Sequence, residues 1–152
     1  MMAMRQWASR HPRPFMAAYR LSSALFLGLA PLWRAVGTRR VERPLAFLER
    51  GLKGFLFDCR MCGNCVLSET GMSCPMNCPK ALRNGPCGGV RGDGNCEVKP
   101  DMRCVWVAAS EGSRKLGEAM PLSPILAPVD HARRGRSAWL ALLEETGKEP
   151  AA

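Results

Sequence analysis

The residues of this sequence whose type and spacing could do chemistry are its cysteines. All eight lie within 46 residues of the 152-residue chain. About one residue in six of that window is a cysteine, roughly twice the density that indicates a disulfide or metal scaffold. The spacing reads C-x2-C-x2-C-x8-C-x3-C-x8-C-x8-C-x7-C, formed by Cys59, Cys62, Cys65, Cys74, Cys78, Cys87, Cys96 and Cys104. Thiols in such a pattern can form disulfides, bind zinc or bind iron–sulfur clusters.

Disulfides explain the even number of cysteines but not their spacing. Cys59, Cys62 and Cys65 lie too close together in the sequence for three independent structural bridges, and no convincing export signal precedes them. Zinc sites usually combine two CxxC pairs, or one pair with two histidines. His11 and His131 lie outside the window, so zinc would require two four-thiolate sites. Zinc stays an alternative.

Iron–sulfur clusters account for more of the pattern. In a CxxCxxC triplet, the two-residue spacing lets each sulfur bind a different iron of one [4Fe–4S] cluster. Cysteine followed by proline, another part of the bacterial ferredoxin pattern, occurs at Cys74 and Cys78. Eight thiolates complete two clusters, and the glycines around Cys87 allow backbone N–H groups to approach the sulfurs. The sequence therefore favours two [4Fe–4S] clusters over zinc, without indicating which cysteines share a site.

No catalytic residues accompany these cysteines in the sequence. The cysteine window contains no paired carboxylates and no Cys–His couple. The glycines of residues 88–94 do not form a nucleotide-binding fingerprint, because no strand is expected before them and no helix directly after them. Cations near an anionic cluster would raise its reduction potential. Four of the cations among the cysteines are candidates for this role, and each is equally well interpreted as solvated surface charge: Lys80, Arg83, Arg91 and Lys99.

The flanks are basic on the N-terminal side. The chain has a net charge of +9, and most of the excess lies before Cys59. Nucleic acid is not an expected partner, because no aromatic residues interleave with the short basic runs. The apolar stretch 21–33 is shorter than the about 20 residues that span a membrane. A core helix, or a helix on a partner or a membrane face, is expected there, so membrane contact is at most peripheral and the location cytoplasmic.

These patterns predict a small mostly-α, loop-rich metal-cluster domain with helical flanks. Helices are expected over 15–36, from Pro44 onward, after Cys104, and over 137–145 with Ser137 as the cap. The expected divisions are a flexible N-terminus at 1–14, a helical basic docking segment at 15–57, a cysteine-rich cluster-binding domain at 58–110, and an extended Pro-rich segment with a short C-terminal helix at 111–152.

Several strings in the cysteine window carry a family resemblance. They are CRMCGNCVL from residue 59, GMSCPMNCPKALRNGPCGGVR from residue 71, DGNCEVKP from residue 93 and CVWV from residue 104. Together they resemble the cysteine-rich methylenetetrahydrofolate reductase C-terminal domain, over about residues 55–110 and with all eight cysteines in register. The flanks 1–54 and 111–152 lie outside the resemblance.

The resemblance implies a role in one-carbon folate metabolism. Members of this family act as the iron–sulfur subunit beside a flavin-dependent TIM-barrel methylenetetrahydrofolate reductase, or are fused to that barrel. The chain would then pass electrons to or from the flavin of this partner through its eight cluster cysteines. FAD or FMN and folate would be bound only by the partner, and the chain itself would be a non-catalytic subunit. The alternative functions are a structural zinc module that holds the same partner and a stand-alone ferredoxin-like carrier.

Overall fold

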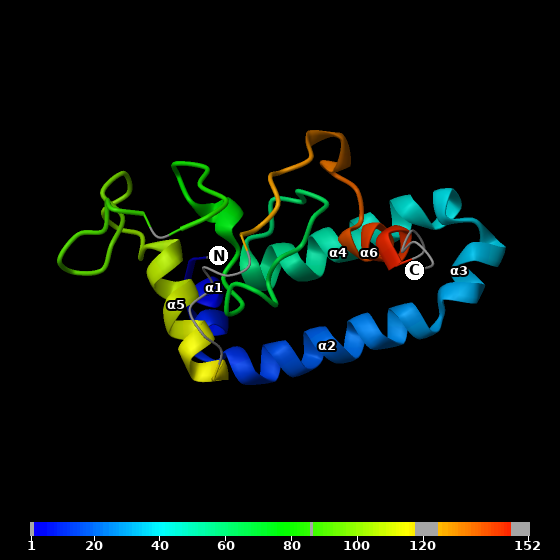
Figure 1. The fold of residues 1–152 in the computed structure, drawn as a ribbon, viewed down its shortest axis with the longest axis horizontal. Helices are drawn as coiled ribbons and strands as arrows, with labels where there is room; N and C mark the ends of the chain where they lie inside the picture. The colour runs from blue at the N-terminus through cyan, green and yellow to red at the C-terminus, as the bar shows by residue number, and fades with distance from the viewer. Residues whose placement is uncertain (1, 86, 118–124, 147–152) are drawn as a thin grey trace.

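The structure is a computed structural model, and it describes residues 2–85, 87–117 and 125–146. Two long helices, α2 (Pro12–Gly28) and α4 (Thr38–Phe57), run along the molecule and are joined by the short helix α3 (Ala30–Val36) (Figure 1). Helix α6 (Ala138–Thr146) packs against both α2 and α4. The described residues contain two isolated β-bridges and no β-strand. The mostly helical character of the prediction is thus confirmed.

An aromatic core holds α6 between the long helices. The ring of Phe26 on α2 stacks on Trp33 of α3 at 5.1 Å and on Trp139 of α6 at 5.9 Å. Leu140 and Leu143 of α6 are buried in the same cluster. Because Ser137 Oγ accepts a hydrogen bond from the Leu140 backbone N–H at 3.4 Å, the predicted cap of the last helix is also present.

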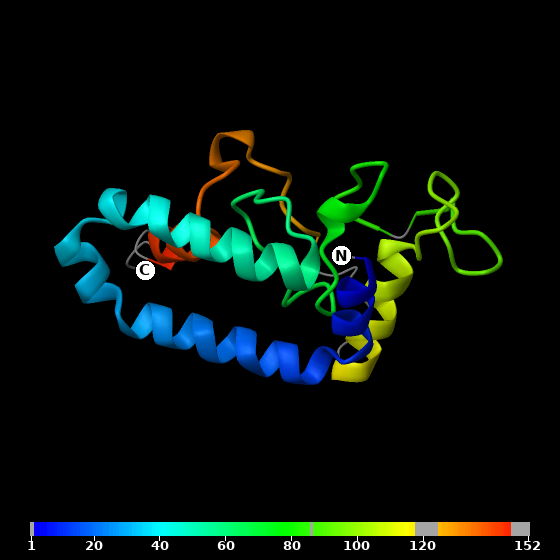
Figure 2. The same cartoon turned by 180° about the vertical axis from the view of Figure 1, so that it is seen from behind.

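The N-terminal residues differ from the expected flexible lead-in. Met2–Arg10 form helix α1, which packs against α4 and against α5 (Val105–Leu116), as Figure 2 shows from behind. Ala8 is fully buried in the core formed by these helices. Pro12 and Pro14 lie in the first turn of α2, where proline is well tolerated.

The two predicted central helices have different bounds in the structure. The segment expected as one helix over 15–36 is two helices, and α2 and α3 meet at a 55° bend just before Pro31. The next helix begins at Thr38 rather than at Pro44, which lies inside α4. Proline there removes one backbone hydrogen bond, but Val41 and Leu45 on either side of it pack into the aromatic core and keep the helix continuous.

Within the described part of the chain, no single helix is both long and apolar enough to cross a membrane. Only α2 and α3 taken together, despite their bend, reach that length and composition.

The cysteine window is built of turns, as its composition predicts. Its regular elements among the described residues are the 3₁₀ turn η1 (Pro75–Asn77) and the two bridges Val90–Cys96 and Asn95–Arg103. The expected helix after Cys104 is α5. The Pro-rich segment expected to run extended within 111–152 lies partly outside the described residues. Its part from residue 125 has neither helix nor strand before the 3₁₀ turn η2 (His131–Arg133).

Candidate metal centre

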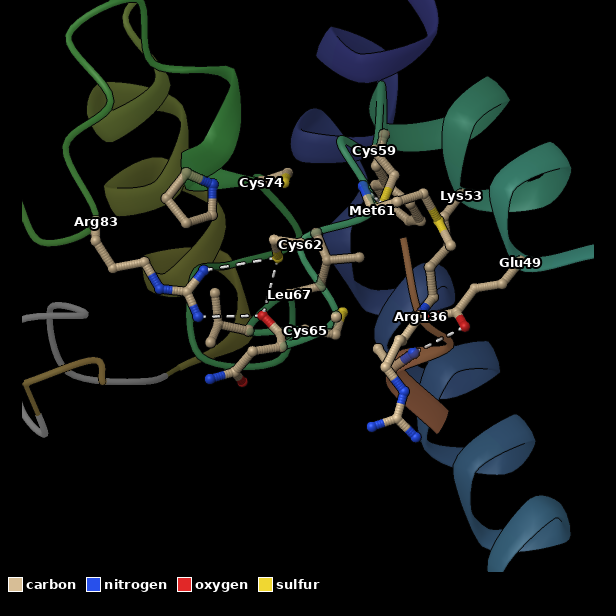
Figure 3. Close-up of a pocket in the computed structure, with 16 residues that line it drawn as sticks. Glu49, Lys53, Cys59, Met61, Cys62, Cys65, Leu67, Cys74, Arg83 and Arg136 are labelled. Carbon is tan, nitrogen blue, oxygen red and sulfur yellow. Dashed lines mark hydrogen bonds and ion pairs between the residues drawn. The ribbon is translucent and has the colours of Figure 1, made fainter. Parts of the chain in front are cut away.

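Four of the eight cysteines lie around one pocket. Helix α4 ends at Asp58, whose left-handed backbone (φ 52°) turns the chain directly into the CxxCxxC triplet. The triplet and the cysteine at the start of η1 line this pocket (Figure 3). We call them the inner cysteines: Cys59, Cys62, Cys65 and Cys74. The structure therefore supplies a grouping that the sequence left open.

The segment 125–137 lies over the inner cysteines. The Gly135 N–H donates to the Met61 carbonyl at 2.8 Å, and Asn84 exchanges two hydrogen bonds with the backbone of Leu126. Gly63, in the middle of the triplet, has a φ of +74° and lies so close to Arg133 that a β-carbon would collide with the Arg133 carbonyl oxygen. A glycine at position 63 thus allows the C-terminal segment to cover the pocket.

Backbone N–H groups point at the cysteine sulfurs. The N–H of Met61 donates to Cys59 Sγ, and the N–H of Gly89 donates to Cys87 Sγ, both at 3.4 Å. Met61 adopts a left-handed conformation (φ 49°), which is uncommon for a residue with a side chain. A thiol sulfur is a weak acceptor, whereas an anionic thiolate is a stronger one. These donors therefore suit sulfurs that are deprotonated by a metal.

Burial acts against ionised thiols in the pocket. It raises the pKa of Cys59 to about 11 and that of Cys74 to about 12. A bound metal reverses this preference, because it deprotonates the thiols that coordinate it. The pocket therefore suits thiolates only when positive charge accompanies them.

The other four cysteines lie in the turns beyond the 3₁₀ turn η1. Cys78 packs beside Cys96 around Met102 and Val105, while Cys87 packs against the cluster of Cys104 and Trp106. The four thiols are thus divided between two apolar clusters. We call them the outer cysteines: Cys78, Cys87, Cys96 and Cys104.

Trp106 has a polar atom that the described structure leaves unsatisfied. Its side chain is buried, and its indole Nε1–H has no hydrogen-bond partner. A buried donor without an acceptor is costly, and the ring packs with Cys104 and Cys87. A thiolate or sulfide at the outer cysteines would be a suitable acceptor.

Neither histidine joins the cysteines. The ring of His11 interacts with the Trp7 carbonyl, and His131 is exposed on the 3₁₀ turn η2. Across the described residues, no three Cys, His, Asp or Glu side chains converge closely enough to hold a single metal ion.

The sequence analysis missed the most buried charges of the pocket. Lys53 and Glu49 on α4 are 5% and 1% exposed and form an ion pair. Four apolar residues of the same helix are instead largely exposed: Phe47, Leu48, Leu52 and Phe55. We call these four the apolar face of α4. The detectable signal was the i, i+4 spacing of Glu49 and Lys53, which is typical of a helical ion pair.

Of the four cations that the sequence singled out, one reaches the pocket. Arg83 is buried, with its Nη1 4.0 Å from Cys62 Sγ and its other nitrogens bonded to the carbonyls of Asn64 and Ala127, both at 3.1 Å. Lys80 instead pairs with Glu97, Arg91 lies 3.8 Å from Asp93, and Lys99 is exposed.

Comparison with known proteins adds a family. A family model described as "Methylene-tetrahydrofolate reductase C terminal" matches residues 38–132, from the first residue of α4 through all eight cysteines. No curated protein and no solved structure matches the chain.

Proposed function

Because the chain belongs to the methylenetetrahydrofolate reductase C-terminal family, we propose that it is a cytoplasmic iron–sulfur electron-transfer subunit of a methylenetetrahydrofolate reductase. The membership confirms the family that the cysteine strings predict. The proposal adds two [4Fe–4S] clusters on the eight cysteines, and a flavin-dependent TIM-barrel partner that binds the folate. When bound, such clusters supply one-electron transfer.

The observation that carries the proposal is the pocket of the inner cysteines. A [4Fe–4S] cluster has four irons, and each takes one thiolate, so the thiols need to surround a space. Cys59, Cys62, Cys65 and Cys74 do so, and a backbone N–H is directed at Cys59 Sγ. A zinc ion bound by four thiolates is the alternative occupant.

A second cluster is supported by the surroundings of the outer cysteines. The Gly89 N–H donates to Cys87 Sγ. The Trp106 indole N–H, which has no partner in the described structure and packs with Cys104 and Cys87, would be available to a cluster sulfur. Donors of this kind tune the potential of iron–sulfur clusters. The two observations give the outer cysteines the same donor chemistry as the inner ones.

The apolar face of α4 supports a protein partner. Phe47 and Phe55 are 80% and 59% exposed. A group of neighbouring apolar side chains exposed to solvent is typical of an interaction surface. This face lies inside the family match, which begins at Thr38, whereas α2 lies outside it. We assign the reductase barrel to this face, because the surface belongs to the part of the chain that the family shares.

Anaerobic purification followed by metal analysis and absorption spectroscopy tests the clusters. We expect about eight irons per chain and a broad absorption band at about 400 nm that dithionite bleaches. About two zinc ions per chain and no such band would contradict the proposal and favour the structural zinc module.

A binding assay tests the partner. The Phe47→Ser/Phe55→Ser variant should lose capture of the flavin-bearing reductase, while its iron content stays unchanged. Leu21→Ser is the matched control, because Leu21 is equally apolar and 72% exposed but lies on α2. Failure of the native chain to bind the reductase would favour a stand-alone carrier, and loss of binding only in the Leu21 variant would move the interface to α2.

A further inference from the structure

A buried ion pair lies beside the pocket of the inner cysteines. Figure 3 shows Glu49 and Lys53 reaching it from α4 on one side and Arg83 reaching it from the other. Charged side chains are almost never fully buried unless paired. The pair therefore needs an explanation in terms of what surrounds it.

Glu49 is held in place from behind. Its Oε1 pairs with Lys53, while its Oε2 accepts a hydrogen bond from Ser137 Oγ at 2.8 Å and from the Ala138 N–H at 3.0 Å. Those donors lie at the N-terminus of α6, which favours negative charge. Helix α6 thus fixes the carboxylate, and the carboxylate fixes the lysine.

Lys53 is oriented by aromatic rings as well. Its Nζ lies 5.0 Å from the ring centroid of Trp139 and 5.8 Å from that of Tyr19, distances typical of cation–π contacts. The ion pair with Glu49 and these ring contacts together hold the ammonium group beside the inner cysteines.

The charge balance of the pocket gives this ammonium a role. A cluster with four thiolates is anionic, and reduction adds one more negative charge. Burying such charge is unfavourable without a compensating cation. A cation near the cluster stabilises the reduced state more than the oxidised one, and this raises the reduction potential.

We propose that Lys53 is a tuning cation, which raises the reduction potential of the cluster held by the inner cysteines, and that Glu49 is the residue that positions it. This inference rests on the proposed function. Arg83 contributes from the opposite side through its contact with Cys62. Lys53 lines the pocket of the inner cysteines, whereas Lys80, beside the outer cysteines, is paired with Glu97 near solvent. We therefore expect Lys53 to affect mainly the inner cluster.

A potentiometric titration of the full chain, monitored by electron paramagnetic resonance, measures the reduction potential of each cluster and tests the inference. In Lys53→Met, at a fixed potential near the midpoint, the ratio of reduced to oxidised inner cluster should fall at least about tenfold. This corresponds to about 59 mV for a one-electron couple. The outer cluster should keep its potential, and Lys53→Arg, which retains the charge, should stay close to the native value.

Two further variants keep the test decisive. Lys53→Met leaves the buried Glu49 carboxylate without a cationic partner. Glu49→Gln/Lys53→Met removes both charges and should show the same direction of shift. Lys80→Met, the matched control at the outer cysteines, should leave the inner potential unchanged.

The outcomes separate the two proposals. A native chain without iron would overturn the proposed function. A native chain with two clusters whose potentials do not move in either Lys53→Met variant would overturn only the role of Lys53. Loss of the inner cluster from both of these variants would make Lys53 a structural residue, and this too would overturn its role in tuning.

Discussion

The inner and outer cysteines present the same number of thiols in different surroundings. The inner cysteines lie between α4 and the covering segment 125–137, with Lys53 and Arg83 buried beside them. The outer cysteines lie in turns whose charges, such as Lys80 with Glu97, pair near the surface. The number and type of ligands therefore do not determine the environment of a site. The charges beside the thiols and the segment that covers them come from residues distant in sequence.

The difference concerns folding as well as electrostatics. The inner pocket is surrounded by helices that pack into two apolar cores. Among the described residues, the turns between Cys78 and Cys104 are held by two bridges, turn hydrogen bonds and small apolar clusters, without a packed helix inside the segment. A metal bound by four thiols contributes folding free energy directly, and the outer region has the greater need of it.

Metal removal should expose this difference most strongly. In the iron-free chain, amide hydrogen exchange should show a loss of protection across residues 78–104 of about a hundredfold or more, because little else orders these turns. Helices α4 and α6 should keep most of their protection. Equal loss in both regions would show that the inner pocket depends on metal as much as the outer turns do.

Single cysteine replacements should show which cysteines bind which cluster. Cys65→Ser and Cys74→Ser should each lower the iron content from about eight to about four per chain and remove the same paramagnetic signal. Cys87→Ser should remove the other signal. If Cys65→Ser and Cys74→Ser removed different signals, the grouping into inner and outer cysteines would be wrong.

Breaking the buried ion pair should destabilise the folded protein. Lys53→Met strands the Glu49 carboxylate and should lower the free energy of unfolding by about 3–5 kcal/mol, measured by denaturant titration. Glu49→Gln/Lys53→Met should recover most of the loss, since it leaves no unpaired charge. Lys80→Met should have no measurable effect, and a comparable loss there would remove the contrast between the two regions.

Replacing a glycine at the inner pocket should destabilise the folded protein more than replacing a glycine among the outer cysteines. Gly63→Ala combines a positive φ with a collision against Arg133 and should cost about 2 kcal/mol. Gly92→Ala is the control, because a β-carbon there meets only open space. If the two variants had similar midpoints of denaturation, the claim that segment 125–137 packs closely over Gly63 would be wrong.

Local signals predicted the parts of the fold that local interactions decide. Ser137 before an apolar run marked the start of α6, and the glycines and prolines between Cys59 and Cys104 predicted turns rather than helices. The cysteine strings also identified the family correctly. In each case the residues that form the feature are neighbours in the sequence.

Tertiary contacts decided what the sequence could not predict. Periodicity shows which residues of α4 share a face, but not which face turns inward. The burial of Glu49 and Lys53 depends on Ser137, almost ninety residues away. The grouping of Cys74 with the CxxCxxC triplet has the same origin, because the core formed by α1, α4 and α5 positions the loop between them.

Helix α4 alone separates the inner pocket from the apolar face. Lys53 and Phe57 border the inner pocket, while Phe47 and Phe55 point outward from the same helix. An α-helix with its side chains is about 10–12 Å across. A flavin held at the surface of a protein docked on the apolar face would thus lie about one helix diameter from the inner thiols. The length of the electron path would be set by the thickness of a single helix.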